Sequence, residues 1–207
     1  RKDKSILFWR SLPITDAETV VSKLLTAVFV LPLVTFVAII VTHLVNLVIT
    51  TGWVMVRGGD AAHLIWGSVP LFDNWAAALI VTLASAIWMS PLIGWFLFVS
   101  AYTKRSPLLM AFMPLIIIPI IEWIFFRSQI FASAVFGRGE MIPLFREMDI
   151  ERFFDEERMK VNEELVSLLA HIDVGKFLLS PSVWAGVVVC ALFAAAAIYV
   201  RRYRDET

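Results

Sequence analysis

The chain has a single cysteine, Cys190, among its 207 residues. One thiol cannot form an intrachain disulfide and cannot build a cysteine metal cluster. The three histidines are too scattered along the sequence to suggest a set of zinc ligands. They are His43, His63 and His171. We therefore expect neither a metal ion nor a bound cofactor.

Sequence motifs that carry catalysis are also missing. The one Gly-Lys pair, Gly175-Lys176, is followed by Phe177 and lacks the upstream glycine of a phosphate-binding loop. The chain has neither an HExxH zinc-protease motif nor a GxSxG nucleophile elbow. Basic residues are too few, and too close to apolar runs, to suggest a nucleic-acid surface. These absences predict a chain that is not an enzyme and does not hydrolyse ATP by itself.

Long hydrophobic runs are what the chain has in abundance. Hydrophobic residues make up 59% of the sequence, and the mean hydropathy is +0.80. A membrane-spanning helix needs about 20 mostly apolar residues, and four runs meet or approach that length. The runs are Leu24 to Thr50, Trp75 to Tyr102, Pro107 to Phe126 and Val183 to Val200. We expect an all-α integral membrane protein, with residues 1–207 forming one transmembrane domain of four helices.

The positions of Lys and Arg predict how these helices are oriented. Basic residues collect before the first run, between the second and third runs, and after the last run. They are Arg1, Lys2, Lys4, Arg10 and Lys23; Lys104 and Arg105; and Arg201, Arg202 and Arg204. With four spans these regions share one side, which the positive-inside rule assigns to the cytoplasm. Both ends are therefore expected in the cytosol, and short amphipathic helices are expected in the outer segment 127–182.

The N-terminus carries no signal-peptide pattern. The chain begins with Arg1 rather than Met, and the residues that follow, RKDKS, contain no apolar core of a secretory signal. We expect a fragment that lacks upstream membrane segments.

Polar side chains inside the apolar runs are the candidate functional residues. His43 and Asn46 lie about one turn apart in the first run, and Glu122 is the one formally charged residue in all four runs. His43 and Asn46 either line a translocation path or form a hydrogen bond between helices. Glu122 needs a partner, and Arg127 and His43 are the candidates. Glu122 either forms a structural ion pair, or is an interfacial carboxylate, or is a substrate or proton site.

Three prolines predict irregular helices within the runs. Pro91 follows Ser90 in the second run, where the missing amide frees a carbonyl one turn back and favours a kink. Pro114 and Pro119 predict a bent or partly unwound third span.

The N-terminal stretch from Ser5 to Leu25, SILFWRSLPITDAETVVSKLL, places an aromatic and basic segment directly before the first run. Within it, Thr15-Asp16-Ala17-Glu18 has the spacing of a capping box, which predicts a helix that begins at Thr15. The plain interpretation is a well-capped membrane helix with an interfacial lead-in.

Three stretches of the sequence resemble a known membrane-protein family. FWRSLPITDAETVVSKLL, Phe8 to Leu25, is similar to a pattern with an LP-[IV]-[ST] core followed by Lys-Leu. SPLIGWFLFVSAYTKRSPLLMAFMPLIIIPIIEW, Ser90 to Trp123, is similar to two helices joined by a short basic turn. SPSVWAGVVVCALFAAAAIYVRRYRDE, Ser180 to Glu206, is similar to a closing helix with an arginine-rich tail. Together they resemble the permease subunit of bacterial type-2 ATP-binding-cassette exporters.

The resemblance implies a location and a mode of action. The four spans would be the last four of six in a bacterial inner-membrane exporter that works beside a second permease copy. The cytosolic segment 1–23 would hold a coupling helix that docks on a separate ATP-binding subunit. Its contact residues would be Phe8, Trp9, Arg10, Leu12, Pro13, Ile14 and Asp16. ATP-driven closure of the ATPase subunits would then push on this element.

Two other classes of protein stay open on the sequence alone. One is a non-transporting membrane scaffold or assembly subunit that binds a partner through its outer helices. The other is an intramembrane enzyme, for which Glu122 with His43 is the one polar pair that the spans offer.

Overall fold

The structure is a computed structural model that describes residues 15–67, 70–103, 106–139, 142–145 and 168–204. Its elements over these ranges are helical, with one isolated bridge between Phe145 and Ile172. Four of the helices are long and apolar enough to cross a membrane. The expected all-helical membrane architecture is thus confirmed at this level.

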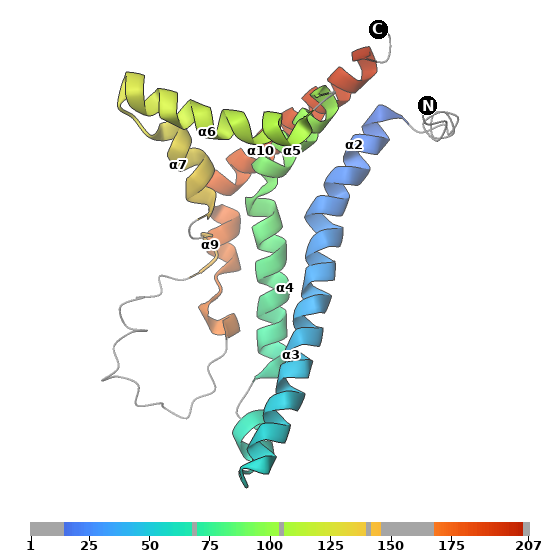
Figure 1. Ribbon diagram of the computed structural model, residues 1–207, viewed down its shortest axis with the longest axis vertical. Coiled ribbons are helices and arrows are strands. Elements are labelled where there is room, and N and C mark those ends of the chain that lie inside the picture. The colour runs from blue at the N-terminus through green and yellow to red at the C-terminus, as the bar shows by residue number, and fades with distance from the viewer. Residues whose placement is uncertain (1–14, 68–69, 104–105, 140–141, 146–167, 205–207) are drawn as a thin grey trace. The chain divides into compact units, whose positions relative to one another are not determined.

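Figure 1 shows the helices of the described residues, coloured along the chain from blue to red. In chain order they are α2 (Asp16–Leu25), η1 (Thr26–Val30), α3 (Leu31–Val56), η2 (Ala62–Trp66), α4 (Leu71–Trp88), α5 (Ser90–Tyr102), α6 (Pro107–Phe126), α7 (Ile130–Phe136), η3 (Gly137–Gly139), η5 (Leu168–His171), α9 (Val174–Leu179) and α10 (Pro181–Arg204).

The contacts between residues divide the chain into two compact units. The first unit contains Arg1–Val28, Ile87–Glu140 and Trp184–Thr207, and the second contains Phe29–Ala86 and Met141–Val183.

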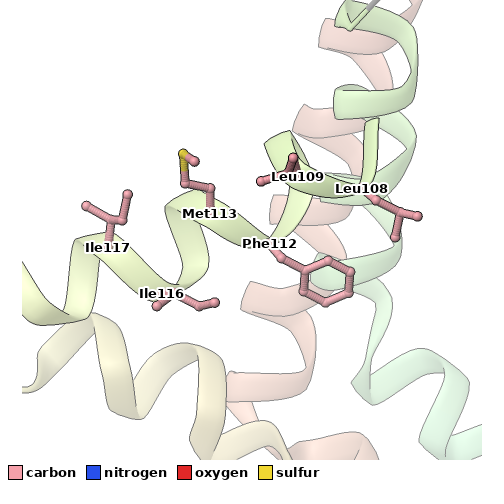
Figure 2. Close-up of a pocket in the computed structure, with 6 residues that line it drawn as sticks. All are labelled: Leu108, Leu109, Phe112, Met113, Ile116 and Ile117. Atoms are coloured by element: carbon pink, nitrogen blue, oxygen red, sulfur yellow. The ribbon is translucent and has the colours of Figure 1, made fainter. Parts of the chain in front are cut away.

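The candidate membrane spans are Asp16–Val56, Leu71–Trp88, Pro107–Phe126 and Pro181–Tyr203. Most of the large apolar side chains of the first and third spans are exposed, and α6 gives the clearest case. Six of its side chains form a continuous apolar strip along the helix: Leu108, Leu109, Phe112, Met113, Ile116 and Ile117 (Figure 2). A soluble monomer rarely exposes such a strip, whereas lipid chains accept it at no cost. The four helices indicate a multi-pass membrane protein.

The first span is a continuous helix of 41 residues from Asp16 to Val56. At about 1.5 Å per residue it is roughly twice as long as the hydrocarbon core of a bilayer is thick. It contains a π-helical turn, η1, directly before α3. Pro32 near the start of α3 lacks the amide that would bond to the preceding turn, which accounts for the wider turn there.

The second expected span, Trp75 to Tyr102, is two helices rather than one. α4 ends at Trp88, and Met89 leaves the helical region with φ −83° and ψ 1° before α5 begins at Ser90. The amides of Leu92 and Ile93 both donate to the Met89 carbonyl. Pro91 cannot donate to the turn before it, so the helix restarts where the sequence predicted a kink. In contrast, α6 runs as one helix through Pro114 and Pro119.

The second unit has a small core of its own. Leu47 of α3 packs with Ala61 and Ile65, and Val54 and Leu71 cover this cluster. α3 thus contacts the π-helical turn η2 that follows it.

In the first unit, α5 and α10 approach closely at Gly94. A Cβ atom on Gly94 would lie 2.9 Å from the Cα and 3.0 Å from the carbonyl oxygen of Cys190. Both contacts are with backbone, which cannot swing aside as a long side chain can. Gly94 therefore sets the distance between these two helices.

We expect Gly94→Ala to destabilise the protein by about 1–3 kcal/mol because the added methyl group overpacks the contact with α10. Thermal unfolding of the purified protein in detergent measures this change. The matched control is Gly52→Ala in α3, where a Cβ atom meets nothing within 4 Å. In that helix the same substitution is expected to stabilise by about 0.5–1 kcal/mol. Equal unfolding temperatures for the two variants would contradict the close approach.

Candidate functional site

The capping box at the start of α2 is confirmed. The Glu18 amide donates to the Thr15 hydroxyl oxygen at 3.2 Å, and the Thr15 amide donates to Glu18 Oε2 at 2.8 Å. These two bonds satisfy amides that a helix start leaves without intrahelical partners. α2 therefore begins at a defined residue inside the segment that the resemblance assigns to ATPase docking.

α2 is attached to the rest of the first unit through one buried side chain. Val20 is 3% exposed and forms a cluster with Ala194 and Ala197 of α10. Partly buried hydrophobic side chains of α2, α5 and α10 pack around this cluster. They are Leu24, Phe98, Ala101 and Ile198. The small alanine side chains let the two helices approach closely.

An ion pair holds the first turn of α2 to the C-terminal end of α10. The Arg201 Nε atom lies 3.2 Å from Asp16 Oδ1, and both side chains are about one-third exposed. The pair joins residues 185 positions apart in the sequence. Together with Val20 it fixes α2 at two points along α10.

Asp16 is the one predicted docking residue that the structure describes. The other six lie outside the described residues: Phe8, Trp9, Arg10, Leu12, Pro13 and Ile14. Asp16 pairs with Arg201, so it connects the first turn of α2 to α10.

His43 and Asn46 have different surroundings in the second unit. His43 is partly buried, and its Nδ1 atom accepts a hydrogen bond from Trp75 Nε1 at 3.0 Å. The two rings meet edge to face with centroids 6.2 Å apart. This bond connects α3 to α4, so it matches the helix–helix interpretation of His43. Asn46 is exposed one turn further along α3.

Glu122 organises the turn between α6 and α7. Arg127 ends α6 in the left-handed region, with φ 49° and ψ 28°, and α7 folds back beside α6 (Figure 1). This reversal brings the amides of Ile130 and Phe131 to the Glu122 carboxylate at 2.7 and 2.9 Å. The Ser128 hydroxyl also donates to it, at 2.8 Å.

The carboxylate of Glu122, a residue of α6, therefore caps the start of the next helix, α7. It compensates the amides and the positive end of α7, as an acidic side chain does at a helix start. Among the described residues no ion pair joins Glu122 to Arg127, the partner that the sequence suggested. The contacts that are present favour the structural interpretation of Glu122.

Arg138 and Trp88 form a polar junction that the sequence did not predict. The Trp88 indole donates to the Arg138 carbonyl at 2.8 Å, and Arg138 Nη1 donates to the Trp88 carbonyl at 2.6 Å. The guanidinium also lies over the Trp88 ring, 4.5 Å from its centroid. Burial lowers the pKa of Arg138 below its ordinary value. The only local signal in the sequence is an arginine between two glycines, Gly137 and Gly139.

We expect Glu122→Ala to lower the unfolding temperature of the protein more than Glu122→Gln, because glutamine keeps one accepting oxygen. Ser128→Ala removes a single donor and is the mild control. Thermal unfolding in detergent, with limited proteolysis at the α6–α7 turn, measures the order of the three variants. An alanine variant as stable as the wild type would show that the carboxylate does not hold the turn.

No family model, no curated protein and no solved structure matches the chain. The functional argument therefore rests on the contacts described above.

Proposed function

We propose that this chain is the membrane-spanning permease part of an ATP-driven exporter, coupled to a separate ATPase subunit through its N-terminal segment. The observation that carries the proposal is the attachment of α2 to α5 and α10. A docking segment can transmit force only if the element behind it is firmly connected to the membrane helices. α2 meets that requirement through Val20 and through the pair between Asp16 and Arg201.

The mechanism that follows is mechanical. Closure of the ATPase subunits pushes on the segment around Trp9 and Leu12, and the capped start of α2 receives the displacement. Because α2 contacts α10 at Val20 and α5 through the surrounding apolar side chains, both helices receive the load. Packed helices move between discrete arrangements rather than deforming smoothly, as a two-state transporter requires.

Two irregular turns supply plausible flexure points for such a change. One is the π-helical turn η1, and the other is the break at Met89 between α4 and α5. Both interrupt regular helical hydrogen bonding, so bending there breaks fewer bonds than bending a regular helix does. Each lies in the sequence at or near a division between the two compact units.

We expect Trp9→Asp and Leu12→Asp to abolish co-purification of the ATPase subunit with the full-length protein, since a charge replaces each apolar contact. The ATPase to use is one that carries a phosphate-binding loop and is encoded next to this protein's gene. Trp53→Asp, an equally drastic change at the C-terminal end of α3, is the matched control and should leave the complex intact. Undiminished ATPase association in the Trp9 and Leu12 variants would contradict the coupling assignment. It would favour the alternative of a non-transporting membrane scaffold.

A second prediction separates docking from transmission. Asp16→Arg and Arg201→Asp each break the ion pair, and we expect each to reduce substrate-stimulated ATPase activity about two- to fivefold, the range for a partly exposed pair. The exchange variant, Asp16→Arg with Arg201→Asp, should restore activity. Co-purification of the ATPase is the control and should not change. Failure of the exchange to restore any activity would rule out the pair as a link.

A further inference from the structure

One face of α10 is exposed from the middle of the helix to its C-terminal end. Its residues recur at the three- and four-residue spacing of a single helical face. They are Val188, Leu192, Ala195, Tyr199, Arg202 and Tyr203. The buried residues Cys190, Ala194 and Ala197 lie on the side of α10 that packs against α5 and α2. The exposed face therefore points away from these two helices.

The first part of this face is apolar. Val188 and Leu192 are 58% and 64% exposed. Ala195 has a much smaller side chain than its neighbours on the face, so a hydrocarbon chain can approach the helix backbone closely there. At about 1.5 Å per residue, the stretch from Val188 to Ala195 covers about 10 Å of the helix. It is an apolar surface that leads to a polar end.

Tyrosines mark the polar end of the face. The rings of Tyr199 and Tyr203 lie side by side, with centroids 4.4 Å apart. Tyr102, the third tyrosine of the chain, lies at the matching end of α5, because its neighbour Ala101 packs around the same alanine cluster as Ile198 of α10. Aromatic side chains with a polar tip are enriched where a membrane helix meets water. The tyrosines thus place this end of α10 at the level of lipid headgroups.

Arg202 gives this end a positive charge. It is exposed, and within the part of the chain that the structure describes it forms no ion pair. Arg201 points about 100° away around the helix and pairs with Asp16, so that carboxylate is already neutralised. A guanidinium suits a phosphate group well, and each tyrosine hydroxyl can donate a further hydrogen bond to a phosphate oxygen.

We infer that this face of α10 binds a phospholipid with a net negative headgroup. The phosphate lies at Arg202 beside the two tyrosine hydroxyls, and one acyl chain follows Ala195 and Leu192 toward Val188. A zwitterionic headgroup carries the same phosphate but adds a cation, which Arg202 repels. The binding needs no ATPase, so it is independent of the proposed coupling function.

The test uses the purified full-length protein in phosphatidylcholine nanodiscs without any ATPase. A phosphatidylglycerol with a diazirine in the middle of one acyl chain is photo-crosslinked, and labelled residues are mapped by mass spectrometry. We expect labelling between Val188 and Ala195. Unlabelled phosphatidylglycerol should compete at least fivefold better than added phosphatidylcholine, because one arginine near the headgroups favours an anionic lipid by about that factor. Free glycerol phosphate, which has no acyl chain, should not compete.

Variants test the two ends of the face separately. Arg202→Gln should weaken competition by phosphatidylglycerol about fivefold or more, whereas Arg202→Lys keeps the charge and should retain most of it. Lys23→Gln, the same loss of charge at an exposed residue of α2, is the matched control and should bind normally. Ala195→Phe should at least halve the labelling because the ring occupies the place of the acyl chain. Ala38→Phe, at an exposed alanine of α3, should not change it.

Three outcomes would overturn the inference. Equal competition by the two phospholipids would show that the face is a lipid-exposed surface with no preference for an anion. Undiminished competition in Arg202→Gln would show that this arginine does not hold the headgroup. Crosslinks between two copies of the protein at Leu192 or Tyr199, without specific labelling by the lipid, would show that a second copy covers the face.

Discussion

The backbone groups at helix ends constrain this chain more than any other feature, because away from water each free amide or carbonyl needs a partner inside the protein. Several polar side chains of the first unit lie where helices begin, end or reverse. Thr15 and Glu18 close the start of α2, and Glu122 closes the start of α7. Trp88 and Arg138 exchange hydrogen bonds at the junction after α4. Most of the candidate site residues therefore serve to hydrogen-bond backbone groups at helix ends.

This constraint changes how an intramembrane charge is interpreted. A lone carboxylate in a membrane helix suggests a substrate or proton site, since its desolvation is otherwise costly. Glu122 instead has three donors within 2.9 Å, two of them amides of α7. The left-handed turn at Arg127 makes this possible by directing α7 back along α6. A short helix held from its neighbour in this way needs no cap from its own sequence.

The sequence was most informative about features that depend on near neighbours. The capping box needs only the spacing of Thr15 and Glu18, and the break before α5 follows from Pro91. Four apolar helices follow from composition and run length. The long first helix agrees with the plain interpretation of its capped start, because α2 continues through η1 into α3.

Contacts between distant residues could not be predicted in the same way. Asp16 and Arg201 are 185 positions apart, and Trp88 and Arg138 are 50 apart. The sequence around each of these residues does not indicate its partner, because the pairing depends on how the helices pack. Glu122 is an intermediate case: its donors are six to nine residues away, yet they reach it only through the left-handed turn at Arg127.

The contact between Gly94 and Cys190 has a practical consequence. Cys190 is the only cysteine in the sequence, and it is buried against α5. A thiol reagent can reach it when α5 moves away from α10, and its rate of reaction then measures how often these helices separate. The protein thus contains a native chemical reporter for separation of these two helices, one turn of α10 away from the contact between Ala194 and Val20.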